Sequence, residues 1–401
     1  MQKFILKIMA FGMLLLGSSM MLFSIDASAS PANGPKIETD QWVEAEIEGL
    51  EFESIEQYWN NLSNDYKQYF PNHRLPTMNE LMFSNDQHFQ LSTILTGLLK
   101  FLLQEIIYNG KLLLIIVMLS IFSMMLETLQ TAFERNAISK IAYSITYMVL
   151  VLLAIDSFTV AISYAKEAIE QMISFMLAMI PLLLTLLASM GGVVTVSVLH
   201  PLIIFMIHLV GTIIYLIVFP LLFFSAVLHI VSAITDKFKV TQLANMFRNV
   251  AISILGILFT IFLGVISVQG ATSSISDGVA LRTAKYVTGN FVPVVGKMFS
   301  DAADTVLSAS LVAKNAIGLA GVVVLLIIAA FPALKIVALA LIYHISGAVM
   351  QPLGDSPITK CLQMIGKTML YVFSALAVVS LMFFLAITII ITAGNTSVMM
   401  R

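Results

Sequence analysis

The ionisable residues within long apolar tracts are the first candidates for chemistry in this sequence. Asp156 is the one charged residue of tract 141–164. A charged side chain in a membrane-spanning helix by default faces the interior of a helix bundle or a water-filled path. Asp156 is therefore either part of a permeation path or a hydrogen-bonded helix-packing residue near the membrane surface.

Histidine and cysteine give no sign of a metal site or a cofactor. Four histidines lie within or beside apolar tracts: His200, His208, His229 and His344. No two of them are spaced closely enough, with a carboxylate nearby, to hold a metal ion. We interpret them as core or interface residues. Cys361 is the single cysteine, which excludes an intrachain disulfide and a cysteine-based metal cluster. The sequence also lacks a phosphate-binding glycine loop, HExxH and G-x-S-x-G, so we predict that the chain is not an enzyme.

Two stretches combine small residues, prolines or glycines with charges. In 267–315, glycines and small residues alternate with charged ones, and four of these are candidate interaction residues: Arg282, Lys285, Asp301 and Asp304. The composition suits either close helix contacts and irregular backbone away from lipid, or an amphipathic connection on the membrane surface. The second stretch, 351–357, has two prolines and a glycine around Asp355 and predicts a rigid turn.

These candidates must be positioned by a membrane-embedded helix bundle. Of the 401 residues, 59% are hydrophobic and 11% are charged, whereas soluble domains have about 25% charged residues. Several apolar tracts reach the roughly 20 residues that a helix needs to cross a bilayer. Because lipid satisfies no backbone polar groups, spans this continuous are helices. The predicted fold class is all-α, a polytopic integral membrane helix bundle with a small extracytoplasmic helical segment before it.

We expect about eight spans, with six or seven as alternatives. Segment 220–234 is short for a full crossing, and its surroundings would also suit a broken or re-entrant helix. The predicted tracts are 112–129, 141–164, 172–189, 196–219, 220–234, 250–268, 316–342 and 368–391.

Three segments precede the transmembrane domain, which we place at 111–401. Residues 1–29 read as a signal peptide, with lysines, an apolar stretch and a small-residue cleavage pattern; an uncleaved anchor is the alternative. Residues 30–90 are acidic, which suits a solvated domain rather than a nucleic-acid surface, and 43–69 have the periodicity of an amphipathic helix. Residues 91–110 have a further apolar stripe and predict an interfacial helix.

The distribution of Lys and Arg predicts the orientation. The basic loops around Arg135, Lys237 and Lys360 are expected in the cytoplasm, which places both ends of the mature chain outside. A repeat of roughly 112–119 residues is also possible, because residues 133–139 resemble 247–253 and Phe219-Pro220 resembles Phe331-Pro332.

Three passages resemble one known family. SVQGATSSISDGVALRTAKYVTGNFVPVVGKMFSDAADTV, AVMQPLGDSP and FFLAITIIITAGN are similar to stage III sporulation protein AE of endospore-forming bacteria. The order of signal peptide, acidic outer segment and polytopic bundle also fits, so the resemblance extends over essentially the whole chain.

The resemblance implies a membrane component of the channel, or feeding tube, between mother cell and forespore. It implies a place in the mother-cell-derived outer forespore membrane, with the mature N-terminus facing the intermembrane space. The implied partners are the other stage III sporulation A proteins and, across the gap, stage II sporulation protein Q. A stand-alone transporter or permease, and a non-conducting scaffold for channel rings, are the alternative functions.

Overall fold

The computed structural model describes residues 53–70, 75–83, 91–132, 137–234, 240–291, 295–354 and 356–399. Every regular element in these ranges is helical, which confirms the predicted all-α class. The predicted signal peptide, the first part of the acidic segment and Asp355 lie outside the described residues.

Among the described residues, three helices precede the bundle: α3 (Glu53–Tyr66), α4 (Met78–Phe83) and α5 (Leu91–Tyr108). The described part of the amphipathic helix expected over 43–69 is α3, prolonged by a 3₁₀ turn to Tyr69. Helix α4 begins with a capping box, in which the Thr77 backbone N–H donates to Glu80 Oε2 at 2.8 Å and the Glu80 N–H donates to Thr77 Oγ1 at 3.3 Å.

The bundle itself consists of long antiparallel helices. A π-helical segment (Ile214–Val218) joins α8 directly to α9, and a 3₁₀ turn (Gln351–Leu353) lies between the last two helices. The helices are α6 (Gly110–Ala132), α7 (Ala137–Ser189), α8 (Val193–Ile213), α9 (Phe219–Ile234), α10 (Thr241–Phe291), α11 (Val295–Met350) and α12 (Pro357–Met399).

Within the described ranges, six helical stretches are long and apolar enough to cross a membrane. Six was among the expected alternatives, and the number of crossings stays a prediction. Tracts 141–164 and 172–189 belong to the single helix α7. Tracts 196–219 and 220–234 are likewise one continuous stretch. A proline lacks the backbone N–H that a helix uses, and the π-helical turn before Pro220 accommodates this without breaking the helix.

The passage 267–315 is not a connection lying on the membrane surface. Helix α10 continues to Phe291 and α11 begins at Val295, so nearly all of the passage prolongs two bundle helices. The turn expected at 351–357 is confirmed. Gly354 has φ of 130°, which L side chains rarely adopt, so glycine is required there.

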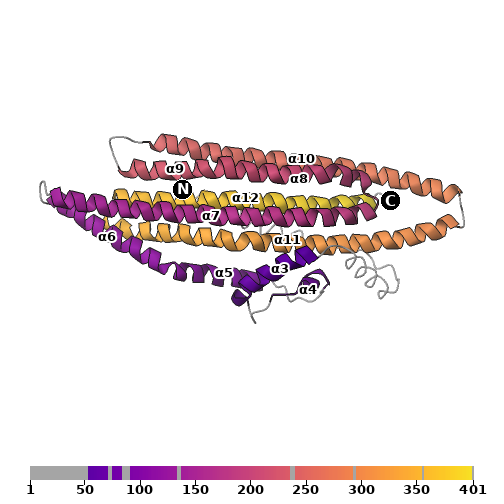
Figure 1. The fold of residues 1–401 in the computed structure, drawn as a ribbon, viewed down its shortest axis with the longest axis horizontal. Coiled ribbons are helices and arrows are strands. Elements are labelled where there is room, and N and C mark those ends of the chain that lie inside the picture. The colour runs from indigo at the N-terminus through magenta and orange to yellow at the C-terminus, as the bar shows by residue number, and fades with distance from the viewer. Residues whose placement is uncertain are drawn as a thin grey trace. The chain divides into compact units, whose positions relative to one another are not determined.

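The antiparallel course separates two ends of the bundle. The adjoining ends of α6 and α7, of α9 and α10, and of α11 and α12 lie at one end of the bundle (Figure 1). We call it the basic end, because the sequence has Arg135, Lys237 and Lys360 between or next to these helices. The α7–α8 turn, the adjoining ends of α10 and α11, and the end of α12 lie at the other. The grouping agrees with the expected orientation, which itself stays a prediction.

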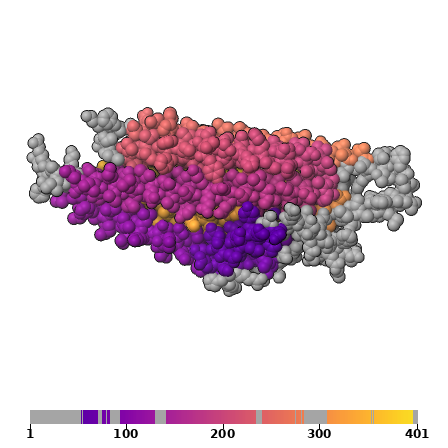
Figure 2. Space-filling model, viewed as in Figure 1, coloured from indigo at the N-terminus to yellow at the C-terminus, as the bar shows by residue number. Residues whose placement is uncertain are grey.

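Helices α7, α11 and α12 form the centre of the bundle, and α3 and α5 pack onto it. The Tyr66 ring stacks on Phe331 of α11 at 3.6 Å between centroids, and Phe101 of α5 meets the same ring edge-on. Trp59 is buried and its Nε1 donates to the Pro76 carbonyl at 2.9 Å. These helices therefore cover part of α11, some of which is visible between the N-terminal helices and α7 (Figure 2).

Candidate functional site

The exposed side of α10 is the main candidate site. Along α10, polar side chains and glycines recur every three or four residues, which places them on one face of the helix. All are exposed except Asn245, which is half-buried: Gln242, Asn245, Asn249, Ser253, Gly256, Thr260, Gly264 and Ser267. We call these eight residues the polar face of α10.

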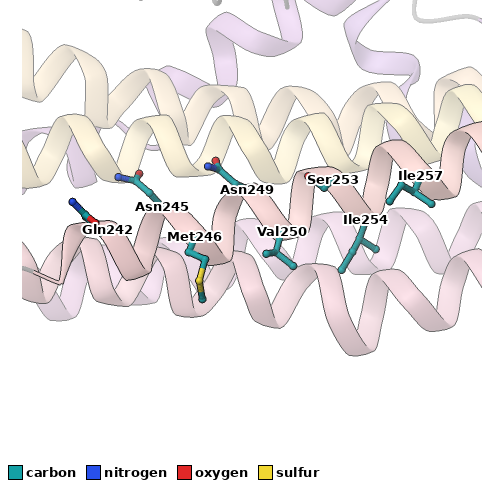
Figure 3. A pocket seen from close by; sticks show the side chains of 8 residues that line it. All are labelled: Gln242, Asn245, Met246, Asn249, Val250, Ser253, Ile254 and Ile257. Atoms are coloured by element: carbon teal, nitrogen blue, oxygen red, sulfur yellow. The ribbon is translucent and has the colours of Figure 1, made fainter.

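A groove lies at the end of the polar face nearest the basic end. It has a volume of about 570 Å³, and α10 supplies all of its lining residues. Gln242, Asn245 and Asn249 point to one side of α10, whereas Met246 and Val250 point to the other (Figure 3). Farther along, a Cβ atom built at Gly256 or Gly264 would meet nothing within 4 Å. No described part of the chain therefore fills the space beside these glycines.

The surroundings of the polar face follow from its location. It lies in the stretch Thr241–Ala280, and only 28% of the most apolar 18 residues of this stretch are buried. Lipid tails offer no hydrogen bonds to amide and hydroxyl groups, and small residues along one helix face allow another helix to approach closely. Such a face is suited to contact with water or with a protein helix in the membrane.

Asn245 connects the polar face to the bundle interior. The buried His229 of α9 lies with Nε2 3.3 Å from Asn245 Oδ1 and with Nδ1 2.8 Å from the Ser225 carbonyl. Ser225 Oγ in turn donates to the Ala244 carbonyl at 2.8 Å. These bonds fix α9 against the first turns of α10, and so orient the groove.

A second group of polar residues is buried at the end opposite the basic end. Asp277 of α10 is 1% exposed. Its Oδ1 accepts the Val194 N–H at 2.9 Å and its Oδ2 accepts the Thr195 N–H at 3.0 Å. These are free N–H groups of the first turn of α8, where the helix dipole also favours a negative charge. Asp277 therefore caps a helix that is remote in the sequence.

Lys314 of α11 is bonded to α12, upstream of the end of that helix at Met399. Its side chain is fully buried, and Nζ donates to the Ile391 carbonyl at 2.8 Å and to Asn395 Oδ1 at 3.0 Å. A Cβ atom at Gly394 would overlap Lys314 Nζ, so only glycine lets the lysine approach α12.

Both buried charges act by positioning helices. Ser189 Oγ donates to Ser310 Oγ at 3.2 Å, which adds the end of α7 to the same region. The buried Thr195 Oγ1 and Asn315 Oδ1 have no hydrogen-bond partner there. These bonds connect the end of α7 and the start of α8 to α10, α11 and α12, and those made by charged groups are stronger than neutral ones.

The residues expected from sequence do not form one site. Asp156 is exposed on α7. This differs from the default expectation that a charge in a membrane-spanning helix faces the bundle interior. Arg282 is exposed on α10. Lys285 of α10, and Asp301 and Asp304 of α11, lie in helices, but their side chains are not among those described.

Sequence reasoning missed Asp277 and Lys314 as site residues. One pattern in the sequence could have indicated both residues, because each follows a serine by four residues. Asp277 follows Ser273 and Lys314 follows Ser310, and both serines are buried. That spacing puts polar residues on the inner side of a helix. Among the described residues, no group of three or more His, Cys, Asp or Glu side chains is placed to hold a metal ion.

Comparison with known proteins agrees with the resemblance seen in the sequence. The family model for stage III sporulation protein AE matches residues 75–394. The chain is 51% identical over 362 residues to the stage III sporulation protein AE of Bacillus subtilis (strain 168), covering 90% of each chain. No solved structure matches. The chain therefore belongs to the stage III sporulation protein AE family.

Proposed function

We propose that this chain is a membrane component of the channel that joins mother cell and forespore during endospore formation. Family membership supports a role in sporulation, and the six candidate spans suit a multi-pass membrane protein. The polar face of α10 is the structural observation that carries the channel role. It gives a membrane-embedded helix a surface for water or for another protein helix, which a lone bundle in lipid would not need.

The proposed location is the mother-cell-derived outer forespore membrane, with the N-terminal helices facing the intermembrane space. There they would be placed to meet other stage III sporulation A proteins and stage II sporulation protein Q. Reporter fusions test this orientation. A reporter after Asn85 should read as external, one at Asp236 or Asp355 as cytoplasmic, and one near Thr396 as external. An external reading at Asp236 would reverse the assignment.

Co-purification from sporulating cells tests the channel role. The tagged full chain, extracted in mild detergent, should bring down other stage III sporulation A proteins, and its deletion should stop sporulation after engulfment begins. A tagged multi-pass protein unrelated to sporulation, expressed at the same level, is the control. Recovery of none of these partners would remove the channel assignment. Movement of a defined solute by the purified chain alone in liposomes would favour a permease instead.

A further inference from the structure

Several bundle helices are much longer than a bilayer is thick. Helices α7, α11 and α12 have 53, 56 and 43 residues. At 1.5 Å per residue, these correspond to about 80, 84 and 65 Å. A bilayer's hydrocarbon core is about 30 Å thick, which about 20 helical residues cross. A large part of the bundle must therefore lie outside the hydrocarbon on one side or the other.

A belt of charged and tyrosine side chains divides the bundle near the middle of α7. Lys166, Glu167 and Glu170 of α7 are exposed. Tyr215 reaches this level from the other side and donates its hydroxyl to the Lys166 carbonyl at 2.8 Å. We call this group the mid-helix belt, and its members are Tyr108, Lys111, Tyr164, Lys166, Glu167, Glu170, Tyr215 and Lys335.

The belt has the composition of a membrane–water boundary. Tyrosines are enriched at the level of lipid headgroups, and long lysine side chains reach toward the same level. Lys335 Nζ lies 4.9 Å from the centre of the Tyr164 ring, and Tyr108 is 84% exposed. A cluster of exposed charges such as Lys166, Glu167 and Glu170 is costly in hydrocarbon, whereas tract 141–164 of the same helix has the single exposed charge Asp156. This clustering suits a surface of the bilayer at the level of the belt.

Helix α6 shows on which side of the belt the hydrocarbon lies. It has 23 residues and is about 34 Å long. It starts at the belt, where Lys111 is its second residue, and ends at the basic end. It runs beside only the half of α7 nearest the basic end (Figure 1). Between the exposed Lys111 and Thr128, its exposed side chains are all large and apolar, as suits contact with lipid: Leu114, Met118, Phe122 and Met125.

The far side of the belt has a different surface. The exposed face of α8 mixes apolar residues such as Phe205 with Ser197, His208 and Thr212. On α10, Thr272, Ser276 and Arg282 are exposed. These surfaces combine polar and apolar groups, as surfaces in contact with water or protein do.

We propose that the bilayer's hydrocarbon ends at the mid-helix belt, where the lysines and tyrosines contact phospholipid headgroups. The part of the bundle between the belt and the basic end, the inner half, is then the transmembrane part. The part beyond the belt, the outer half, stands outside the hydrocarbon and includes α8, Asp277 and Lys314. This placement does not depend on the proposed function, because a channel component, a permease or a scaffold is compatible with it.

Acyl-chain quenching tests the placement with a matched pair of phenylalanines. Phe122 of α6 and Phe205 of α8 are 52% and 60% exposed, on opposite sides of the belt. Each is replaced by cysteine in the full chain carrying Cys361→Ala, labelled with bimane, and reconstituted in phosphatidylcholine vesicles with or without brominated acyl chains. The label at Phe122 should lose most of its fluorescence to brominated lipid, whereas the label at Phe205 should lose none.

Equal quenching of the labels at Phe205 and Phe122 would overturn the proposal. So would a label at Phe122 whose fluorescence does not change with brominated lipid. A second pair lies on α7 itself, Leu152→Cys in the inner half and Ser174→Cys in the outer half, both at exposed positions. This pair decides the question if a variant of the first pair does not fold. Only the Leu152 label should be quenched, and quenching of the Ser174 label would place hydrocarbon beyond the belt.

Discussion

The inner and outer halves of the bundle place their polar groups in opposite ways. In the outer half, Asp277 and Lys314 are buried and each is bonded to another helix. In the inner half, the polar face of α10 is exposed except at Asn245, and Gly256 and Gly264 have open space beside them within the described chain. A buried charge is stable only when the chain itself satisfies it, whereas an exposed polar face in a membrane span requires something outside the chain. The outer half therefore contributes bonds between helices, and the proposed working surface is in the inner half.

The largest loss of stability is expected from Lys314→Ala. The change leaves a cavity between α11 and α12 and leaves Asn395 Oδ1 without its donor, which together cost about 2–4 kcal/mol. Lys314→Met keeps the volume and loses only the hydrogen bonds, so it should cost about half as much. Thermal unfolding of the detergent-solubilised protein measures both. Equal stability of the alanine variant and wild type would mean that the lysine does not fasten α12.

A somewhat smaller loss is expected from Asp277→Ala. The change removes both acceptors for the Val194 and Thr195 N–H groups, which should cost about 1–3 kcal/mol. Glu170→Ala is the matched control, because Glu170 is an exposed acid of the mid-helix belt and its loss should change stability by less than about 0.5 kcal/mol. The same unfolding measurement compares them, and a reversed order would contradict the division of roles between the halves.

A still smaller effect is expected at the belt. Lys335→Met removes the cation from the Tyr164 ring, which should cost about 0.5–1 kcal/mol. Lys335→Arg keeps the cation and should restore most of the difference in melting temperature. A loss as large as that of Lys314→Ala would show that the belt lysine is part of the buried core.

The smallest effect on stability, but a large effect on function, is expected from Gly256→Leu. The new side chain has free space within the chain, so the melting temperature should change by less than the Asp277→Ala variant changes it. The leucine nevertheless fills the open polar face, and spore yield and co-purification with partners should fall. Ile257→Leu, at an exposed apolar position one residue away, is the control. A Gly256→Leu strain that sporulates normally would remove the polar face from the working surface.

Much of the fold was accessible from the sequence. Apolar tracts of bilayer length predict membrane helices, and the periodicity around Trp59 and the prolines beside Gly354 predicted the described part of α3 and the last turn. Whether two neighbouring apolar tracts form one helix or two could not be predicted from the sequence. Lys166 and Glu167 look like a loop between two spans, yet they lie in the middle of α7, because a helix that leaves the bilayer can carry charges without ending.

The sequence by itself determined the family, the all-α class and the apolar tracts, because these depend on residue types and on spacing along one chain. Only the tertiary structure decided which charges are buried and which are exposed. Asp156 lies in a purely apolar tract and is exposed, whereas Asp277 and Lys314 lie in polar passages and are buried. The partners of Asp277 are about 80 residues away in the chain, and so are those of Lys314. A carboxylate or an ammonium group is buried where a distant helix brings N–H or C=O groups to it, and that meeting is set by how the helices pack.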